Sequence, residues 1–317
     1  MEIKSAINKL KNYKSPGPDG LPAEFYKCGT NALAPVIKAQ TDIIWREGRI
    51  PNSWKNGTII VLPKKGNLSE CKNWRGITLL NTIIKILAIV IHDRLLPVVD
   101  ELLRPEQAGF RKNRSCTDHV NTLRIIVEQS VEWQAKLYLL FVDFERAFDT
   151  IHRTAIWSAL ANLGIPDKIT NIIKEMYNDA KYHVRFAGDE SNSFEINRGV
   201  RQGCVLSPML FLIVLDSVMN EVNSATTDGI QWTINTRLND LDYADDIVLL
   251  SHTYNGIEEK LRKLDEIANR AGLKINVNKT KTMRINVSTI APLIRVGLDN
   301  SLGFFYAFFW VFLPLKN

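Results

Sequence analysis

Two adjacent carboxylates, Asp245 and Asp246, lie between two short extended segments of this chain. Asn239-Asp240-Leu241-Asp242 precedes Tyr243-Ala244, and the apolar run 247–250 follows, so the pattern predicts a β-hairpin with the acids at its tip. Neighbouring carboxylates repel, and a fold that holds two together usually needs a cation there. Ligation by oxygen alone points to Mg²⁺ or Mn²⁺ rather than zinc. A solvated turn is the simpler interpretation, and the rest of the chain has to decide between the two.

A third carboxylate, Asp143, ends the continuous apolar segment 137–142, which predicts a buried strand. An aspartate at such a place is often the N-cap of the next helix, but Asp149 can fill that role here. If this strand and the hairpin are neighbours in one sheet, Asp143, Asp245 and Asp246 converge. Three carboxylates could bind two Mg²⁺ or Mn²⁺ ions roughly 3.5–4 Å apart, the arrangement used in phosphoryl transfer.

Two loops carry groups that suit a phosphate or a nucleotide. Lys64 follows a β-branched strand predicted at 58–62, and Arg75 follows a polar loop, so the two cations could clamp a phosphate. A solvated basic turn is the alternative. The loop 198–208 contains Arg201, Gln202 and Gly203, and its glycines let the backbone approach a ligand closely. It precedes an apolar run at 209–218 that predicts a buried helix.

The turn 107–115 combines Phe110 with Arg111, Lys112 and Arg114, a composition that suits contact with a nucleic-acid backbone. Other patterns predict scaffold. Amphipathic or apolar periodicity predicts helices at 3–10, 23–47, 82–96, from Ser115 or Thr117 onward, from about 144 to 163, and at 257–271. A hairpin is expected where segments 182–187 and 193–197 flank Gly188-Asp189-Glu190. Segment 273–281 bears three lysines, including Lys279.

Length and composition describe an ordinary globular protein. A chain of 317 residues predicts about two domains or lobes, and 45% hydrophobic with 23% charged residues can form a sizeable core. The net charge of +6 and the pI of about 9.0 suit a polyanionic partner. The four scattered cysteines indicate reduced thiols, and the N-terminus has no secretory signal. We therefore expect an intracellular protein of the nucleus or cytoplasm.

Taken together, the motifs resemble the reverse-transcriptase domain of non-LTR (LINE-type) retrotransposons. They occur in that family's order and spacing over about 270 of the 317 residues. The matching segments are Pro16-Gly17-Pro18-Asp19-Gly20, Leu62-Pro63-Lys64, Asn73-Trp74-Arg75, Gln107-Ala108-Gly109-Phe110, 141–149, 198–208, Tyr243-Ala244-Asp245-Asp246 and 272–281.

The resemblance implies an α+β right-hand polymerase, with fingers at 1–135 and a palm at 136–290 built on an antiparallel sheet packed on helices. It implies that Asp143, Asp245 and Asp246 are the metal-binding catalytic acids. Phe148 matches the steric gate that rejects the 2′-OH of ribonucleotides. The remaining implied nucleotide contacts are Lys64, Arg75, Gln202 and Gly203, and the expected nucleic-acid contacts are Arg111, Lys112, Arg114, Arg201 and Lys279.

The function implied is RNA-directed DNA polymerase, with an RNA template, a DNA primer or target, dNTPs and two Mg²⁺ or Mn²⁺ ions. Maturases of group II introns and telomerase-like polymerases are the enzymatic alternatives. A poorly active or non-catalytic RNA-binding remnant of a retrotransposon is the alternative of a different class, because the family's thumb is not recognisable in this sequence.

Two features depart from the family pattern. Gly76 stands where much of the family has proline. The segment 291–317 includes the uncharged aromatic run 301–315, which is shorter than the roughly 20 residues that span a bilayer. We expect 291–317 to be non-homologous sequence on a truncated copy of the element, and therefore no membrane partner. A membrane anchor is the alternative interpretation of this segment.

Overall fold

The computed structural model describes residues 1–226, 228–287, 294–296, 300–301 and 303–306. The chain forms two compact units, and each is built from two separate stretches of sequence. Unit 1 combines Met1–Leu102 with Ile151–Phe211, and unit 2 combines Leu103–Thr150 with the chain from Leu212 onward. The units therefore interleave along the chain, whereas the sequence analysis expected contiguous segments, fingers at 1–135 and a palm at 136–290. The fingers and palm boundaries themselves stay a prediction.

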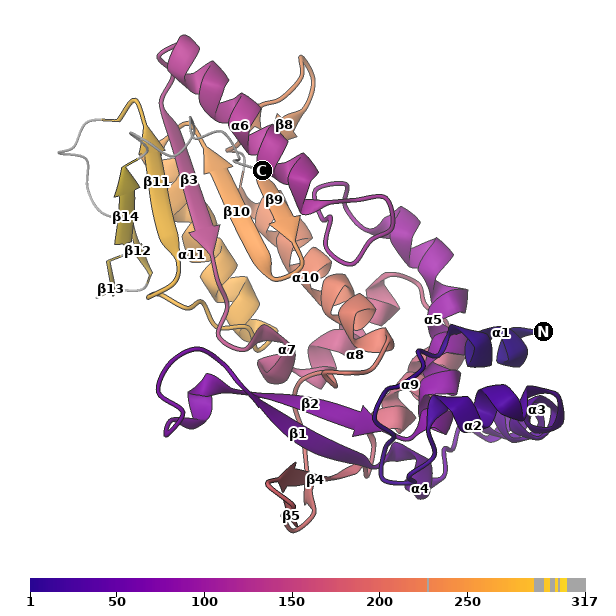
Figure 1. Cartoon of the computed structure of the whole chain (residues 1–317). Helices are drawn as coiled ribbons and strands as arrows, with labels where there is room; N and C mark the ends of the chain where they lie inside the picture. The colour runs from indigo at the N-terminus through magenta and orange to yellow at the C-terminus, as the bar shows by residue number, and fades with distance from the viewer. Residues whose placement is uncertain (227, 288–293, 297–299, 302, 307–317) are drawn as a thin grey trace. The chain divides into compact units, whose positions relative to one another are not determined.

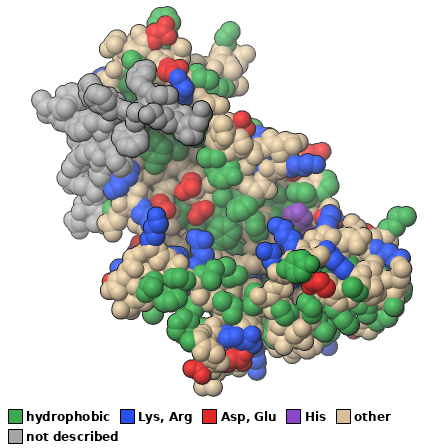
Figure 2. All heavy atoms as spheres, in the orientation of Figure 1, with side chains coloured by type: hydrophobic (Ala, Val, Ile, Leu, Met, Phe, Trp, Pro, Cys, Tyr) green, Lys and Arg blue, Asp and Glu red, His purple; other side chains and the backbone are tan. Residues whose placement is uncertain are grey.

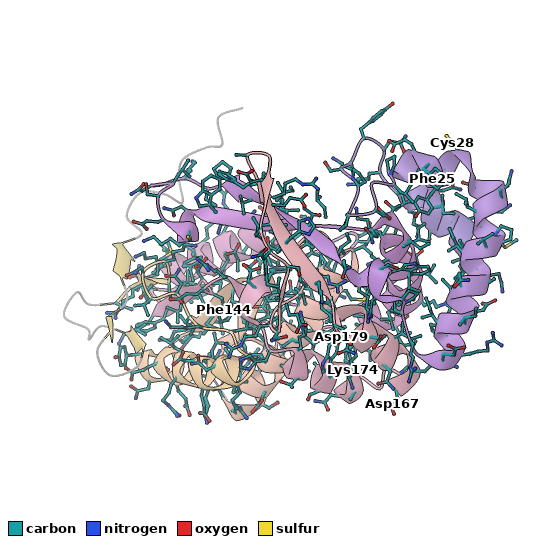
Figure 3. All side chains as sticks on the ribbon, turned by 90° about the horizontal axis from the view of Figure 1, so that it is seen from below. Phe25, Cys28, Phe144, Asp167, Lys174 and Asp179 are labelled. Atoms are coloured by element: carbon teal, nitrogen blue, oxygen red, sulfur yellow. The ribbon has the colours of Figure 1, made fainter. Side chains whose placement is uncertain are left out.

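Unit 1 begins with helices that bury the apolar face expected at its N-terminus. Its helices are α1 (Glu2–Lys9), α2 (Ala23–Cys28), α3 (Thr30–Glu47), α4 (Asn52–Lys55), η1 (Cys71–Asn73), α5 (Thr82–Leu102), α8 (Arg153–Asn162) and α9 (Asp167–Tyr177). Ile3, Ala6 and Ile7 of α1 are buried in one core with residues of α2, α3 and α5. An acid and a base, Asp167 and Lys174, lie in the first and last turns of α9, where they complement the helix dipole (Figure 3).

The sheet of unit 1 is built around β1 (Gly57–Pro63). It pairs antiparallel with β2 (Trp74–Leu80) and parallel with β4 (Lys181–Phe186). The short strands β5 (Asp189–Glu190) and β6 (Phe194–Glu195) both pair with β4. The hairpin expected around Gly188 is therefore present, but β4 also crosses over to β1, a non-local pairing that no short sequence pattern predicts.

Unit 2 contains a sheet with the strand order β14-β11-β3-β10-β9 (Figure 1). Its strands are β3 (Leu137–Val142), β9 (Asp240–Tyr243), β10 (Asp246–Ser251), β11 (Lys281–Ile285) and β14 (Gly303–Tyr306). All pairings are antiparallel except β11 with β14. Two smaller antiparallel pairs are β7 (Ile230–Gln231) with β8 (Arg237–Leu238), and β12 (Arg295–Val296) with β13 (Asn300–Ser301).

Helices cover both faces of this sheet, which explains the uninterrupted apolar run of β3. The helices of unit 2 are α6 (Cys116–Glu132), α7 (Ala147–Thr150), the greater part of α10 (Leu206–Ala225) and α11 (Tyr254–Arg270). Leu137 and Leu139 belong to one buried cluster with Ile126 and Val127 of α6. On the other face, the ring of Tyr138 meets Tyr254 of α11 edge to face, with centroids 6.4 Å apart. Because successive side chains of a strand alternate, β3 must be apolar on both sides.

Several expected helices have different boundaries. The predicted helix 23–47 divides at Gly29, and the helix predicted from about 144 to 163 divides into α7 and α8. In contrast, α5 continues through Pro97 to Leu102, beyond the expected end at 96. Val99 is buried after the proline, and this packing favours continuation despite the lost N–H. The buried helix predicted at 209–218 lies within α10.

The segment 291–317 is described only in part. Strand β14 pairs with β11, so a piece of the expected tail is the edge strand of the sheet. The rest of the aromatic run, from residue 307 onward, lies outside the described residues. Among the described residues, α10 is the one helix long and apolar enough to cross a membrane. Of its most apolar 18-residue stretch, 72% is buried inside the protein. That burial is typical of a core helix.

Candidate active site

Three acidic residues meet at one end of the sheet of unit 2. Val142 of β3 pairs with Ile247 of β10, so the next residues outward, Asp143 and Asp246, stand opposite each other on adjacent antiparallel strands. Asp245 occupies the two-residue loop of the β9–β10 hairpin. Figure 2 shows acidic side chains at the surface where Figure 1 places the tip of this hairpin. The acids could converge only if β3 and the hairpin were neighbours in one sheet, and the pairing of β3 with β10 meets this condition.

The carboxylates of this cluster interact electrostatically. Partial burial, followed by the charges of Asp245 and Asp143, raises the pKa of Asp246 above its ordinary value, while Lys279 opposes the shift. The ammonium of Lys279 lies 3.2 Å from Oδ2 of Asp143. The same ammonium donates a long hydrogen bond to Oδ1 of Asp143 at 3.5 Å, whereas Oδ2 of Asp143 is a buried oxygen with no hydrogen-bond donor. The cluster is therefore short of positive charge and of donors.

The donor set fits a hard divalent cation. Carboxylate oxygens are the ligands that Mg²⁺ and Mn²⁺ prefer, and the oxygen of Asp143 without a donor already faces a positive charge. Among the described residues, however, no three acidic, cysteine or histidine side chains stand in a ready-made metal-ligating arrangement. Asp143, Asp245 and Asp246 would have to adjust their side chains to bind an ion together.

A buried ion cluster that sequence reasoning missed lies on the strand leading into the hairpin. The guanidinium of Arg104 forms ion pairs with Asp216 at 3.2 Å, with Asp240 at 2.7 Å and with Asp242. Burial, the charge of Asp240 and the opposing charge of Arg104 leave the pKa of Asp242 well above its usual range. The available sequence signals were an arginine before Pro105 and the alternation Asp240-Leu241-Asp242. Nothing local indicates that this arginine pairs with these two acids, which lie 136 and 138 residues away.

Phe148, the expected gate, lies in α7 and is half-buried. Its ring meets the exposed ring of Phe110 edge to face, with centroids 6.2 Å apart. Both residues belong to unit 2, as do the three acids. Between β3 and α7 the chain forms an isolated antiparallel bridge between Phe144 and Ile275, in which the backbone N–H of Asn276 donates to the carbonyl of Asp143 at 2.8 Å.

The other expected nucleotide contacts belong to unit 1. Leu62 pairs with Arg75 across the β1–β2 hairpin, and both Lys64 and Arg75 are exposed. The loop containing Gln202 and Gly203 docks on β2, where the N–H of Thr78 donates to the carbonyl of Gln202 at 2.7 Å. Gly203 has φ +120° and a Cβ there would lie 2.5 Å from the carbonyl oxygen of Thr78, so this approach requires glycine.

The comparison with protein families decides what kind of site this is. A family model described as reverse transcriptase (RNA-dependent DNA polymerase) matches residues 62–298, well over half of the chain. The chain belongs to the reverse transcriptase family. The match includes the three acids, Phe148 and the four expected nucleotide contacts of unit 1.

Similar proteins place this reverse transcriptase among those of retrotransposons. It is 27% identical to the uncharacterized 149 kDa protein of transposon TX1 from Xenopus laevis, over 93% of this chain and 23% of that protein. It is 28% identical to the Pol polyprotein of the type-1 retrotransposable element R2 from Popillia japonica, over 95% of this chain and 42% of that protein. The chain thus spans less than half the length of either relative. The resemblance to non-LTR retrotransposon reverse transcriptases is confirmed.

A solved structure supports the fold. The apo telomerase of Candida tropicalis, truncated from its C-terminal domain, superposes with a TM-score of 0.59 at 16% identity. The match covers 76% of this chain and 52% of that one. The α+β right-hand polymerase fold expected from the sequence is confirmed.

Two of the expected nucleic-acid contacts of this reverse transcriptase are buried in the structure. Arg111 is buried, and its guanidinium donates to the carbonyls of Arg104 at 2.7 Å and Gln107 at 3.0 Å. Arg201 is also buried, donates to the hydroxyl of Tyr182 at 2.8 Å and stacks on the ring of Tyr177. Both arginines brace the loops that contain them. Sequence composition could not separate them from surface cations, because buried arginines occur in the same kind of polar loop.

The remaining three expected contacts lie at the surface. Lys112 and Arg114 are exposed, although Arg114 also donates to the carbonyl of Pro105 at 2.8 Å. The side chain of Lys279 is 67% exposed and its ammonium faces Asp143. Contact of these three residues with nucleic acid stays a prediction.

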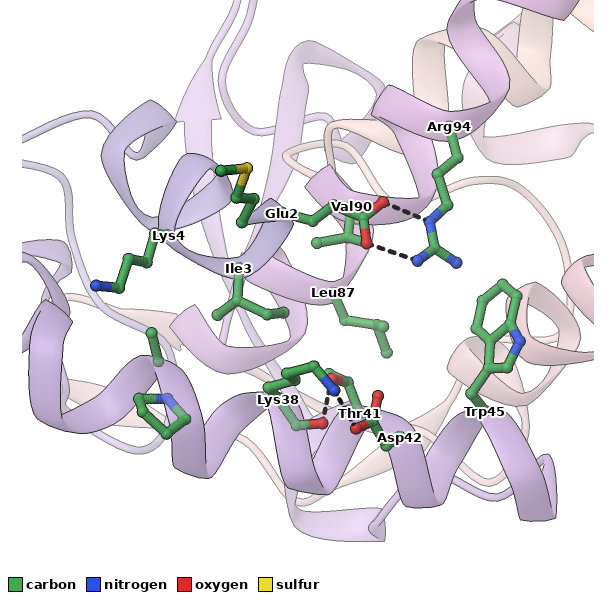
Figure 4. A pocket seen from close by; sticks show the side chains of 13 residues that line it. Glu2, Ile3, Lys4, Lys38, Thr41, Asp42, Trp45, Leu87, Val90 and Arg94 are labelled. Atoms are coloured by element: carbon green, nitrogen blue, oxygen red, sulfur yellow. Dashed lines mark hydrogen bonds and ion pairs between the residues drawn. The ribbon is translucent and has the colours of Figure 1, made fainter.

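A cavity of about 360 Å³ lies apart from the residues described above. Figure 4 shows it in unit 1 among α1, α3 and α5, where Arg94 bonds Glu2 through two nitrogens and its guanidinium lies 4.7 Å from the ring centre of Trp45. Two ion pairs, Arg94 with Glu2 and Lys38 with Asp42, lie in its lining, and Lys4 donates to Asn31 at 3.0 Å. None of the predicted site residues lines it.

Proposed function

We propose that this chain is an RNA-directed DNA polymerase that transfers a nucleotide from a dNTP to the 3′-OH of a DNA primer on an RNA template. The observation that carries the proposal is the meeting of Asp143 with Asp245 and Asp246 at the end of β3 and β10, in a chain of the reverse transcriptase family. The buried oxygen of Asp143 without a hydrogen-bond donor supports a role as a cation ligand.

In this proposal the three carboxylates hold two Mg²⁺ or Mn²⁺ ions. The chemistry that such ions supply when bound is a lower pKa for the attacking hydroxyl and neutralisation of the leaving pyrophosphate. The bond that forms joins the primer O3′ to the α-phosphorus, and the bond that breaks releases pyrophosphate. In addition to the ions, the ammonium of Lys279 places positive charge beside Asp143. It would move away from this carboxylate when an ion binds there.

Other residues bind and select the substrates. Phe148, braced by Phe110, would exclude the 2′-OH of a ribonucleotide. The exposed cations Lys64 and Arg75 would bind the triphosphate, and the close docking of Gln202 and Gly203 on β2 would hold their loop firm beneath the nucleotide and template.

The test is primer extension by the purified chain on a homopolymer RNA template with a DNA primer. We expect incorporation that requires Mg²⁺ or Mn²⁺ and falls about 10²–10³-fold in Asp245→Asn, because one ligand to the ions is lost. Asp265→Asn is the matched control, since Asp265 lies in the same unit on α11 and its carboxylate only accepts from Asn269 at 3.0 Å. Equal activity of the Asp245 variant would refute the proposal. RNA binding without incorporation by the wild-type chain would favour the non-catalytic alternative.

A further inference from the structure

The loop that carries Asp245 has a strained backbone. Tyr243 pairs with Asp246, so Ala244 and Asp245 alone join β9 to β10. Ala244 has φ +56°, whereas Asp245 is not among the described residues with positive φ. Two-residue hairpins with positive φ at the first position favour glycine there. The left-handed region costs a residue with a Cβ roughly 1–2 kcal/mol, so another part of the fold must hold Ala244 in place.

The side chain of Gln107 meets this need. Its Oε1 accepts from the N–H of Ala244 at 2.9 Å and from the N–H of Gly109 at 2.7 Å, and its Nε2 donates to the carbonyl of Ala244 at 3.3 Å. The amide orientation is set by chemistry, because the reverse orientation would point an NH₂ group at two backbone N–H donors. Gln107 is fully buried, so water does not compete for these bonds.

The backbone beside Gln107 is fixed to the same hairpin. The N–H of Ala108 donates to the carbonyl of Asp242 at 2.9 Å, and the N–H of Asp242 donates to the carbonyl of Glu106 at 3.0 Å. A Cβ on Gly109 would lie 2.1 Å from the nitrogen of Ala244, so only glycine permits this approach. The segment 106–109 therefore docks against β9 through an isolated parallel bridge between Gln107 and Asp242, and the side-chain amide of Gln107 reaches Ala244, the residue before Asp245.

We propose that Gln107 is a positioning residue for the catalytic centre: it holds Ala244 in its left-handed conformation and thereby fixes the carboxylate of Asp245. This inference rests on the proposed function. Gln107 has no contact with substrate in this role. Removing it frees Ala244 to relax toward negative φ, which swings Asp245 relative to Asp143 and Asp246. Residues that support metal ligands are typically worth 10–100-fold in metal affinity or activity.

The test compares Gln107→Ala with the wild-type chain by single-nucleotide incorporation and by Mn²⁺ binding followed with electron paramagnetic resonance. We expect kcat to fall about 10–100-fold with KM for dNTP within about 2-fold, and Mn²⁺ binding to weaken by a similar factor. The control is Asn286→Ala, an amide of the same unit that donates to the carbonyls of Ser130 and Ala135. Because Ile285 pairs with Leu137, Asn286 lies at the opposite end of β3 from Asp143. Its loss should lower Tm without changing either readout.

A second variant separates positioning from general stability. Gln107→Ala combined with Ala244→Gly should recover part of kcat and of Mn²⁺ affinity, since glycine adopts positive φ unaided. Wild-type values in Gln107→Ala, or equal losses in Gln107→Ala and Asn286→Ala, would overturn the inference and leave the proposed function standing. A wild-type chain that binds Mn²⁺ without incorporating nucleotides would refute the proposed function, and the inference would then be decided by Mn²⁺ affinity alone. If the wild-type chain bound no Mn²⁺, both would fail.

Discussion

Replacement of Arg104 by methionine should destabilise unit 2 more than any surface charge change, and the loss should depend on pH. Among the described residues, Arg104 is the one cation that forms ion pairs with Asp216, Asp240 and Asp242. Its side chain is only 9% exposed. The three carboxylates together raise the pKa of Arg104 despite its burial, so the guanidinium stays charged. Methionine has a similar length but supplies neither charge nor donors.

The magnitude follows from the burial of the carboxylates. Removing one partner of a buried ion pair costs about 3–5 kcal/mol, because the other charge stays buried and uncompensated. Protonation limits this cost. The folded pKa of Asp242 is already raised, mainly by burial, and that of Asp216 is raised for the same reason. A carboxyl whose pKa is higher in the folded than in the unfolded state stabilises the fold when it is protonated. This stabilisation is lost as the pH rises through the folded pKa. The variant should therefore lose about 1–3 kcal/mol more at pH 8 than at pH 5.5.

Urea unfolding followed by circular dichroism at both pH values measures these differences, with the slope m as the check that the same surface unfolds. Arg185→Met is the matched control, because Arg185 pairs with Glu190 at the surface, where both side chains are about half exposed. That pair should contribute at most about 1 kcal/mol at either pH. A loss in Arg104→Met no larger than in Arg185→Met, or one that is the same at both pH values, would refute the reasoning.

Three further changes have defined outcomes. Phe148→Ala should lower the dNTP-over-rNTP preference in single-nucleotide incorporation, and an unchanged preference in an active variant would remove the gate role. Gly203→Ala should weaken incorporation and lower Tm by several degrees, because its Cβ meets the carbonyl of Thr78 at 2.5 Å with φ +120°; wild-type values would contradict the docking. Burial lowers the pKa of Lys260 to about 8, so wild-type stability should rise by up to roughly 3 kcal/mol between pH 8 and 10.5. A lysine with a lowered folded pKa favours folding once deprotonated, and Lys260→Met should lack this rise.

The sequence predicted the acidic end of the sheet of unit 2 because the signals for its strands are local. The apolar run before Asp143 and the alternation around Asp245 each specify a strand within a few residues, and the family resemblance supplied the order of the motifs. Both strands exist, and they pair in the register that brings the acids together. Helix α1 was equally accessible, since its apolar face repeats with helical periodicity and is buried as expected.

Burial of the polar residues in these loops depends on their particular partners, and some of those partners are distant in sequence. Arg111 and Arg201 have the same local composition as surface cations, and their burial follows from carbonyl and tyrosine partners that fold around them. Gln107 belonged to a recognised motif, yet its role required the position of Ala244, 137 residues away. A buried polar group is defined by its partners, and a linear pattern contains no information about which distant groups satisfy it.

The alternation of β9 shows how one short strand serves two purposes. Asp240 and Asp242 are two residues apart, so they face the same side of the sheet, where Arg104 pairs with both and Asn223 of α10 donates to Asp240. Leu241 faces the other side and joins the apolar cluster with α6. A strand with two buried acids would be unstable without the arginine, and with it the strand cannot shift by one residue without burying unpaired charge. The ion cluster therefore fixes the register of β9, and through Tyr243 and Ala244 that register determines where Asp245 stands relative to Asp143.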